Sequence, residues 1–158
     1  MPIQPFHPDM ATEIVQLWRE SMKQALAPFE NLHPFDDQVR YLVEELGPRC
    51  IVSVFVQQSI IVGFMAQCGD TIEQLYILTT AQRQGIGTQF LDWAKTKSPE
   101  ELNLVTFEKN HRAISFYKKS GFQEMSRGNT DNEEGLPDVQ LRWEVSLADQ
   151  EGTTPEYS

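Results

Sequence analysis

Residues 82–87 read Gln82-Arg83-Gln84-Gly85-Ile86-Gly87, and this stretch decides the predicted fold. It follows a strand-like run, Leu75 to Leu78, and precedes a helix-like run, Thr88 to Lys97. Two glycines let the backbone approach a ligand without interference from a Cβ atom. A helix that begins here directs unpaired N–H groups and the positive end of its dipole toward an anion. The stretch therefore predicts a phosphate-binding loop whose ligating groups belong mainly to the backbone.

Two better-known glycine-rich loops do not fit these residues. A dinucleotide-binding fingerprint requires a third glycine where this chain has Phe90, and a Walker A loop requires a Gly-Lys-Ser/Thr ending that is missing. The pattern that does fit is Gln/Arg-x-x-Gly-x-Gly after a strand, which resembles the acyl-CoA pyrophosphate loop of the GNAT superfamily of N-acyltransferases. For the hexapeptide alone, an ordinary glycine-rich turn between a strand and a helix is the alternative.

Length and composition favour one acidic domain. The chain has 158 residues and a formal net charge of −10, which disfavours nonspecific binding to nucleic acid or to anionic membranes. We expect a single domain over residues 1–147, followed by a polar, acidic tail over residues 148–158 that is disordered. The N-terminus lacks the pattern of a secretory signal, and no apolar run approaches the ~20 residues that a bilayer requires. We therefore expect a cytoplasmic location.

Charge is distributed unevenly along the chain. Residues 83–119 hold seven of the thirteen Lys and Arg residues against four acids, whereas residues 1–49 hold eight acids against four basic residues. This distribution suits a polyanionic cofactor at one end of the molecule and a cationic acceptor at the other. Solvated helix faces are the alternative explanation for any single charge.

The chain has only two cysteines, Cys50 and Cys68. They lack metal-ligand spacing and the context of a small disulfide-rich domain. We therefore expect two buried thiols in strands, and no metal site.

Periodic apolar patterns predict an α/β fold with a mixed sheet. The expected order is a strand, two helices, three strands, a helix, a strand, a helix and two strands, and we expect the second helix to stop at Gly47-Pro48. A strand, a crossover helix and a strand in that order imply a parallel, right-handed unit. The apolar residues of the last strand suit either the core or a homodimer, and they are Val139, Leu141 and Trp143.

A second motif strengthens the resemblance. Residues 110–122 read Asn110-His111-Arg112-Ala113-Ile114-Ser115-Phe116-Tyr117-Lys118-Lys119-Ser120-Gly121-Phe122. This segment is similar to the Asn-x-x-Ala-x-x-x-Tyr-x-x-x-Gly-Phe helix that follows the fifth strand in GNAT enzymes. Because the two motifs occur in the family's order, the chain is identified as a GNAT member from about residue 3 to residue 145. The resemblance implies the GNAT acyl-CoA N-acyltransferase fold, with acetyl-CoA as the acyl donor.

The resemblance also implies which residues bind this donor. The backbone of Leu75, Tyr76 and Ile77 would pair with the pantetheine arm, and Asn110 would reach the same region. Tyr117 would lie near the thioester sulfur. The pyrophosphate would be held by the loop and the start of the helix, which comprise Gln82, Arg83, Gln84, Gly85, Ile86, Gly87 and Thr88.

The chemistry of acyl transfer assigns roles to two of these residues. Transfer from a thioester to an amine requires a neutral amine, a stabilised oxyanion and a proton for the departing thiolate. A tyrosine carries its proton at neutral pH, so Tyr117 suits the acid. A partly buried aromatic residue beside Phe116 is the alternative. The oxyanion donor would be the N–H of Ile77, if the third and sixth strands of the sheet splay apart at a bulge.

The general base is less clearly indicated. Some family members carry a glutamate on the fifth strand, where this chain has Val105. Glu73 is the best replacement, because unbroken alternation would place it on the same face as Leu75 and Ile77. A solvated glutamate and a water relay are the alternatives. His33, in the linker between the first two helices, is a weaker candidate.

These inferences predict an N-acetyltransferase that transfers an acetyl group from acetyl-CoA to a primary amine. The amine would attack directly in a ternary complex, without a cysteine nucleophile. The acceptor stays open among a small amine, an antibiotic, a peptide N-terminus and a protein lysine, because the variable first two helices and the last loop would select it. The alternatives are a noncatalytic acyl-CoA-binding regulatory module and an α/β interaction domain without a cofactor.

Overall fold

The structure is a computed structural model that describes residues 2–27 and 31–146. The tail predicted over residues 148–158 lies outside the described residues. The strands are β1 (Ile3–Pro5), β2 (Ile51–Gln57), β3 (Ile60–Cys68), β4 (Thr71–Ile77), β5 (Glu101–Phe107), β6 (Gln123–Asn129) and β7 (Asp138–Glu144). The α-helices are α1 (Ala11–Ala25), α2 (Phe35–Tyr41), α3 (Gly47–Arg49), α4 (Ile86–Lys97) and α5 (His111–Lys119). Within the described ranges, every helix is too short or too polar to cross a bilayer.

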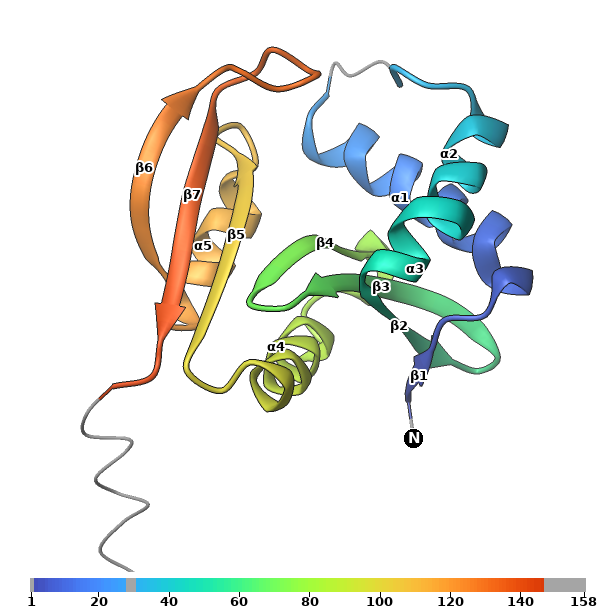
Figure 1. The fold of residues 1–158 in the computed structure, drawn as a ribbon, viewed down its shortest axis with the longest axis horizontal. Helices are drawn as coiled ribbons and strands as arrows, with labels where there is room; N and C mark the ends of the chain where they lie inside the picture. The colour runs from blue at the N-terminus through green and yellow to red at the C-terminus, as the bar shows by residue number, and fades with distance from the viewer. Residues whose placement is uncertain (1, 28–30, 147–158) are drawn as a thin grey trace, which may run out of the picture.

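All seven strands of the described chain join one mixed sheet in the order β1-β2-β3-β4-β5-β7-β6, so the predicted α/β class is confirmed (Figure 1). The crossover through α4 makes β4 and β5 parallel, as the strand-helix-strand order predicts. These two strands pair only through Thr71 with Asn103 and Ile72 with Leu104, and then diverge. The sheet is thus opened between its two halves, next to the glycine-rich loop.

The two faces of the sheet have separate cores. On one face, α1 and the segment before β2 cover β2 and β3 around Phe64 and Val54. On the other face, α4 and α5 pack around Phe90 and Leu104. Val139 and Leu141 of β7 belong to this second core, with 0% and 1% of their surface exposed. Val139 and Leu141 therefore belong to the core and not to a homodimer interface, the other role that their sequence suggested.

The predicted stop of the second helix at Gly47-Pro48 is wrong, because helical structure continues through Gly47–Arg49. The intervening segment Leu42–Leu46 is a π-helix, in which the N–H of Gly47 donates to the carbonyl of Leu42. A π-type turn shifts the hydrogen-bond register, so a proline without an N–H fits the next turn. The N–H of Cys50 then donates to the carbonyl of Leu46 at 2.8 Å and ends the helix.

The prediction of two separate thiols is also wrong. Cys50 and Cys68 form a disulfide, with their Cα atoms 4.4 Å apart. Ile51 of β2 pairs with Gln67 of β3, so the two cysteines occupy the next position along these antiparallel strands. Their spacing in the sequence, 18 residues, carries no signal of this proximity, because the hairpin register creates it.

Candidate active site

The start of α4 exposes backbone donors, as the loop sequence predicts. Gly85 is the N-cap residue, and no side chain of the described residues caps the helix there. The first helical hydrogen bond runs from the N–H of Gln89 to the carbonyl of Gly85, at 3.0 Å. The N–H groups of Ile86, Gly87 and Thr88 therefore have no acceptor within the helix. Together with the helix dipole, they suit a phosphate group.

The two glycines of the loop are required for different reasons. Gly85 has a φ of +78°, and a Cβ built on it would meet no atom within 4 Å. Gly87 has helical backbone, but a Cβ there would lie 2.8 Å from Cζ of Phe116 on α5. Gly85 thus allows the left-handed turn, whereas Gly87 allows α4 and α5 to approach each other.

Side-chain hydrogen bonds hold the loop in place. Gln82 Nε2 donates to the carbonyl of Ile77 at 3.1 Å, while Gln82 Oε1 accepts from Nη1 of Arg112 on α5. Gln57 Nε2 donates to Gln84 Oε1 at 2.8 Å. The loop is therefore tied to β4, to α5 and to the end of β2.

The end of β4 offers free backbone groups beside the loop. The N–H of Leu78 donates to the carbonyl of Val62 on β3 at 2.8 Å. Because alternate residues of a strand direct their N–H groups to opposite sides, Leu75 and Ile77 direct theirs toward β5. At this level β4 no longer pairs with β5. The prediction that the third and sixth strands splay apart is wrong, because β4 and β5 are the strands that diverge; the N–H groups of Leu75 and Ile77 are therefore available to an extended ligand.

A cavity lies in this opening, between β4, β5, the end of α1 and α5. Tyr117 lines it from α5, with its ring centroid 5.2 Å from that of Phe116 and 5.4 Å from that of Phe122. Only 6% of Tyr117 is exposed, and burial raises the pKa of its hydroxyl. The phenol therefore keeps its proton at neutral pH. Both descriptions of Tyr117, as a buried aromatic residue and as a proton donor facing the site, agree with this environment.

Tyr76 contributes its side chain and not, as was predicted, its backbone, because its backbone pairs with Phe64 of β3. Its ring packs between Trp18 and Phe64, with centroid distances of 6.4 and 5.9 Å, and it lines the same cavity as Tyr117. Its hydroxyl donates to Sδ of Met22 at 2.9 Å. Burial raises the pKa of this phenol too. Sequence reasoning missed this role, because a strand residue's face is known only when the register is known.

Glu73 lines the cavity but does not follow the expected alternation. Ala66 of β3 pairs with Gln74, and Gln67 pairs with Ile72, so Glu73 is an extra residue in β4. Such a bulge breaks the shared face that was predicted with the residues after it. Glu73 instead accepts a hydrogen bond from Arg49 and forms an ion pair with it. This contact raises the pKa of Arg49.

Asn110 begins α5 and borders the cavity. Its Oδ1 accepts a hydrogen bond from the N–H of Ala113 at 3.3 Å, which makes it the N-cap. Its amide N–H groups are directed to no other described residue. Val105 also borders the cavity and is 53% exposed, so β5 supplies no carboxylate at this position.

His33 connects two segments that are distant in sequence. Its Nε2 lies 3.0 Å from Oε2 of Glu133, in the loop between β6 and β7, and the hydrogen bond with this carboxylate raises the pKa of His33. Asp37 and Glu134 add smaller electrostatic contributions in the same direction. The β6–β7 loop, at the top of Figure 1, therefore reaches the segment directly before α2. An acidic cluster therefore surrounds His33 where the two segments meet.

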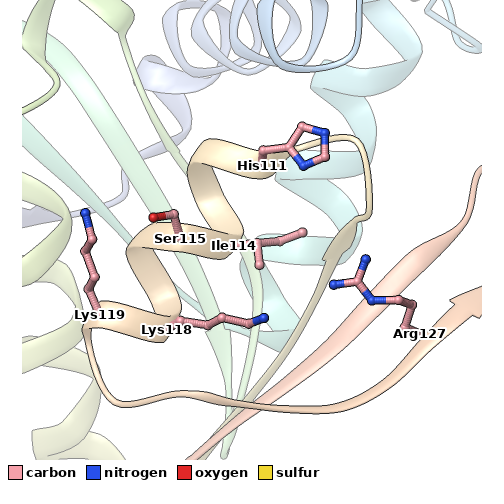
Figure 2. Close-up of a pocket in the computed structure, with 6 residues that line it drawn as sticks. All are labelled: His111, Ile114, Ser115, Lys118, Lys119 and Arg127. Atoms are coloured by element: carbon pink, nitrogen blue, oxygen red, sulfur yellow. The ribbon is translucent and has the colours of Figure 1, made fainter.

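A basic hollow of ~460 Å³ lies on another side of α5, between this helix and β6 (Figure 2). It is lined by His111, Ile114, Ser115, Lys118, Lys119 and Arg127. Two of these cations form ion pairs: Lys118 lies 3.3 Å from Glu124, and Arg127 lies 2.7 Å from the same carboxylate and 3.2 Å from Glu108. The hydrogen bond from Arg127 lowers the pKa of Glu124 to about 2. The local basic charge predicted from the sequence is thus partly used within the protein.

Comparisons with known proteins agree with this geometry. The family model described as "Acetyltransferase (GNAT) domain" matches residues 19–145 of this chain. The peptidyl-lysine N-acetyltransferase YjaB of Salmonella typhimurium is 30% identical over 121 residues, which cover 76% of this chain and 81% of the relative. The solution structure of apo YjaB from Escherichia coli has a TM-score of 0.71 at 26% identity, covering 89% of this chain and 95% of that one. The PaiA N-acetyltransferase of Thermoplasma acidophilum, determined with coenzyme A, shares the fold with a TM-score of 0.68 at 18% identity, covering 90% and 98% of the two chains.

An opened mixed sheet with a helix N-terminus beside the opening defines an acyl-CoA-binding N-acyltransferase. The chain belongs to the GNAT acetyltransferase family. It is an acetyl-CoA-dependent N-acetyltransferase that acts on an amine, as the two sequence motifs predict. No comparison supports the noncatalytic alternative. The roles of single residues in the site stay predictions.

Proposed function

We propose that this enzyme acetylates lysine side chains of peptides or proteins. The observation that carries the proposal is the cavity wall: Met22 and Ala25 of α1 and Leu26 directly after it form an apolar side, and the phenols of Tyr76 and Tyr117 border the same space. A lysine has an apolar stem of four carbons and a polar head, so it suits such a channel. A relative that is 30% identical and covers 76% of this chain bears the name peptidyl-lysine N-acetyltransferase.

The acidic cluster at His33 supports a cationic acceptor. Glu133 and Glu134 belong to the β6–β7 loop, and Glu134 also acts electrostatically on Tyr76 in the cavity. Glu134 therefore places negative charge near both His33 and the cavity. Negative charge there attracts a lysine ammonium and increases the rate of encounter. A neutral or anionic acceptor would gain nothing from it.

The residues around the cavity have complementary roles in this proposal. Acetyl-CoA supplies the acetyl thioester. The loop N–H groups from Arg83 to Thr88 hold its pyrophosphate, while the backbone of Leu75 and the side chains of Tyr76 and Asn110 hold its pantetheine arm. Ile77 donates its N–H to the carbonyl oxygen as negative charge develops there. Tyr117 gives its proton to the departing sulfur, and Glu73 takes a proton from the acceptor amine, directly or through water.

We further propose that residues 1–147 form one catalytic domain, in which the amine attacks directly within a ternary complex. The proposed location is the cytoplasm, since the cosubstrate is an intracellular metabolite. The homodimer considered from the last strand stays a prediction for light scattering to test. The buried Val139 and Leu141 are not part of its interface.

The proposal is tested by measuring the free thiol that acetyl-CoA releases when its acetyl group is transferred. Lysine peptides, amino acids, polyamines and aminoglycosides are supplied as acceptors, and peptides with acetylated lysine serve as controls. We expect the highest kcat/KM for lysine peptides, with an acetyl group on the side-chain nitrogen by mass spectrometry. A higher value for a polyamine or an aminoglycoside would refute the peptide acceptor. If acetyl-CoA binds by calorimetry but no acceptor is acetylated, the catalytic assignment itself is wrong.

A further inference from the structure

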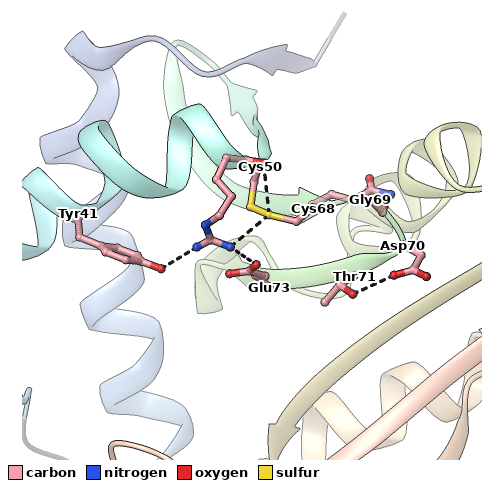
Figure 3. Close-up of a disulfide and its surroundings, with 9 residues drawn as sticks. Tyr41, Cys50, Cys68, Gly69, Asp70, Thr71 and Glu73 are labelled. Carbon is pink, nitrogen blue, oxygen red and sulfur yellow. Dashed lines mark hydrogen bonds and ion pairs between the residues drawn. A yellow bond between two sulfur atoms is a disulfide. The ribbon is translucent and has the colours of Figure 1, made fainter.

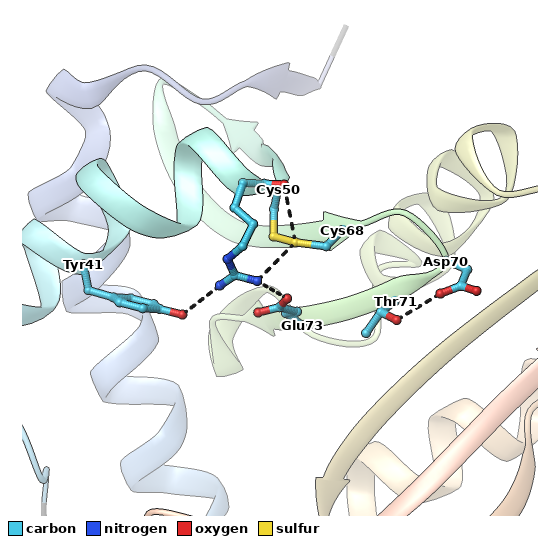
Figure 4. Close-up of polar contacts among 7 residues, drawn as sticks. Tyr41, Cys50, Cys68, Asp70, Thr71 and Glu73 are labelled. Carbon is cyan, nitrogen blue, oxygen red and sulfur yellow. Dashed lines mark hydrogen bonds and ion pairs between the residues drawn. A yellow bond between two sulfur atoms is a disulfide. The ribbon is translucent and has the colours of Figure 1, made fainter.

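The disulfide lies beside a guanidinium that also holds Glu73. Figure 3 shows the bond between Cys50, before β2, and Cys68, at the end of β3. Nη1 of Arg49 lies 3.5 Å from Sγ of Cys68, and the same nitrogen donates a hydrogen bond to Oε2 of Glu73. Nη2 donates to the hydroxyl of Tyr41 at 3.1 Å, and Figure 4 marks these contacts. One nitrogen of Arg49 is thus shared between a sulfur and a carboxylate.

This cluster is accessible from solvent on one side. The side chains of Arg49 and Glu73 are 48% and 28% exposed. Cys68 is half-buried, whereas only 8% of Cys50 is exposed. A reductant therefore reaches the sulfur of Cys68 more easily than that of Cys50. The cluster also borders the active site, because Glu73 lines the cavity that contains Tyr117.

We propose that Cys50 and Cys68 form a reversible thiol–disulfide site that controls how tightly Arg49 holds Glu73. The reductant is a dithiol of the thioredoxin class. It transfers two electrons and two protons: the bond between the two sulfurs breaks, each cysteine becomes a thiol, and the dithiol becomes a disulfide. The proposal rests on the role given to Glu73 in the proposed function.

The charge at Cys68 couples this redox step to catalysis. In the disulfide, the sulfur of Cys68 is neutral and accepts hydrogen bonds only weakly. The guanidinium of Arg49 therefore pairs mainly with the carboxylate of Glu73. After reduction, the adjacent guanidinium favours the thiolate of Cys68, as cations do for cysteines generally. This thiolate and the Glu73 carboxylate then compete for the same Nη1. The carboxylate is released from its ion pair and becomes available to accept a proton from the acceptor amine.

A metal site is the competing interpretation of the same groups. The sulfurs of both cysteines and a carboxylate oxygen of Glu73 lie within 4.8 Å of one another. Only three ligands are present among the described residues, and the cation of Arg49 would lie against the ion. The distance between the Cα atoms, 4.4 Å, also falls in the range of disulfides. The two cysteines therefore suit a disulfide better than a metal ion.

The test compares oxidised and reduced protein, with thiol content measured by a colorimetric reagent. Glutathione disulfide maintains the oxidised form, and thioredoxin with its reductase maintains the reduced form. We expect kcat for a lysine peptide to rise about tenfold on reduction, below the roughly 10²- to 10⁴-fold contribution of a complete general base. The Kd of acetyl-CoA should not change, because the loop that binds it is not part of the cluster.

Two cysteine variants give a matched pair. Cys50→Ser keeps the Cys68 thiolate and should show the high kcat with thioredoxin and its reductase, whereas glutathione disulfide should convert this thiolate to a mixed disulfide, release one glutathione thiolate and lower kcat. Cys68→Ser removes the Cys68 thiolate and should show the low kcat under both conditions. Glu73→Gln should abolish the response to reduction.

Equal kcat of oxidised and reduced wild-type protein would overturn the proposal, and this comparison does not depend on whether the variants fold. Identical behaviour of the two serine variants would also overturn it, as would stoichiometric zinc in the reduced protein by mass spectrometry. If neither redox form acetylates any amine, the proposed function fails. If both forms do so equally, only the redox site fails.

Discussion

Substitution of Gly87 tests how closely α4 and α5 approach each other at the cofactor loop. A Cβ on Gly87 would lie 2.8 Å from Cζ of Phe116 and 3.2 and 3.3 Å from two further ring atoms. Gly87→Ala gains at most ~1 kcal/mol in helix propensity. Forcing a methyl group into packed surroundings costs about 1–3 kcal/mol. We therefore expect a net loss of ~1 kcal/mol in the free energy of unfolding.

The double variant identifies the cause. Phe116→Leu removes the ring, so Gly87→Ala in that background should be neutral or stabilising, with a coupling of ~1–2 kcal/mol between the two sites. Gly85→Ala is the control: it strains the backbone at a φ of +78°, with no atom within 4 Å of the new Cβ. Its cost, ~1–2 kcal/mol, should be the same with either residue at position 116.

Urea denaturation, with and without acetyl-CoA, gives the free energy of unfolding of six proteins: the wild type, the three single variants and the two double variants with Phe116→Leu. The Kd of acetyl-CoA should also rise in Gly87→Ala and recover in the double variant, because movement of the ring or of α4 displaces the loop donors. A Gly87→Ala variant as stable as the wild type would contradict the proposed clash with Phe116. Equal rescue of Gly85→Ala and Gly87→Ala by Phe116→Leu would contradict it as well.

Three further predictions concern the site and its surroundings. Tyr117→Phe should lower kcat by about 10²-fold with an unchanged Kd for acetyl-CoA, since it removes only the donated proton; an unchanged kcat would exclude Tyr117 as the acid. Asn110→Ala should lower the free energy of unfolding by ~1 kcal/mol in urea denaturation, because it removes the N-cap of α5, whereas Asn110→Asp should retain most of it. The pKa of His33 is raised above 6.5, so its pairing with Glu133 should be complete below pH 6.5 and lost as the pH rises through the raised pKa. An NMR titration of the His33 imidazole should give a lower pKa in Glu133→Gln, and identical values in the two proteins would contradict the pairing.

The sequence predicts the order of elements well, because each depends on local pattern. The glycine-rich loop after β4 and the start of α5 at Asn110 lie where the two motifs indicate. The parallel pairing of β4 and β5 follows from the handedness of a crossover connection. These features need only the periodicity of apolar residues and the backbone freedom of glycine.

The errors occur where hydrogen-bond register matters. One extra residue in β4 turns Glu73 away from the expected face and toward Arg49. The π-type turn before Pro48 carries the second helix past its predicted end. In both cases the hydrogen bonds shift by one residue, which changes the face of a side chain or the end of a helix. The spacing of apolar residues in the sequence does not reveal such a shift.

The sequence by itself therefore determined the family, the cofactor loop and the helix that carries Tyr117, because these depend on short motifs with their own backbone geometry. Only the tertiary structure decided what surrounds the chemistry. It joined Cys50 to Cys68, gave Glu73 a guanidinium partner, and brought the ring of Phe116 against Gly87. The physical reason is that these contacts join residues from different elements. Strand register and helix packing set their distances, and no local pattern encodes those.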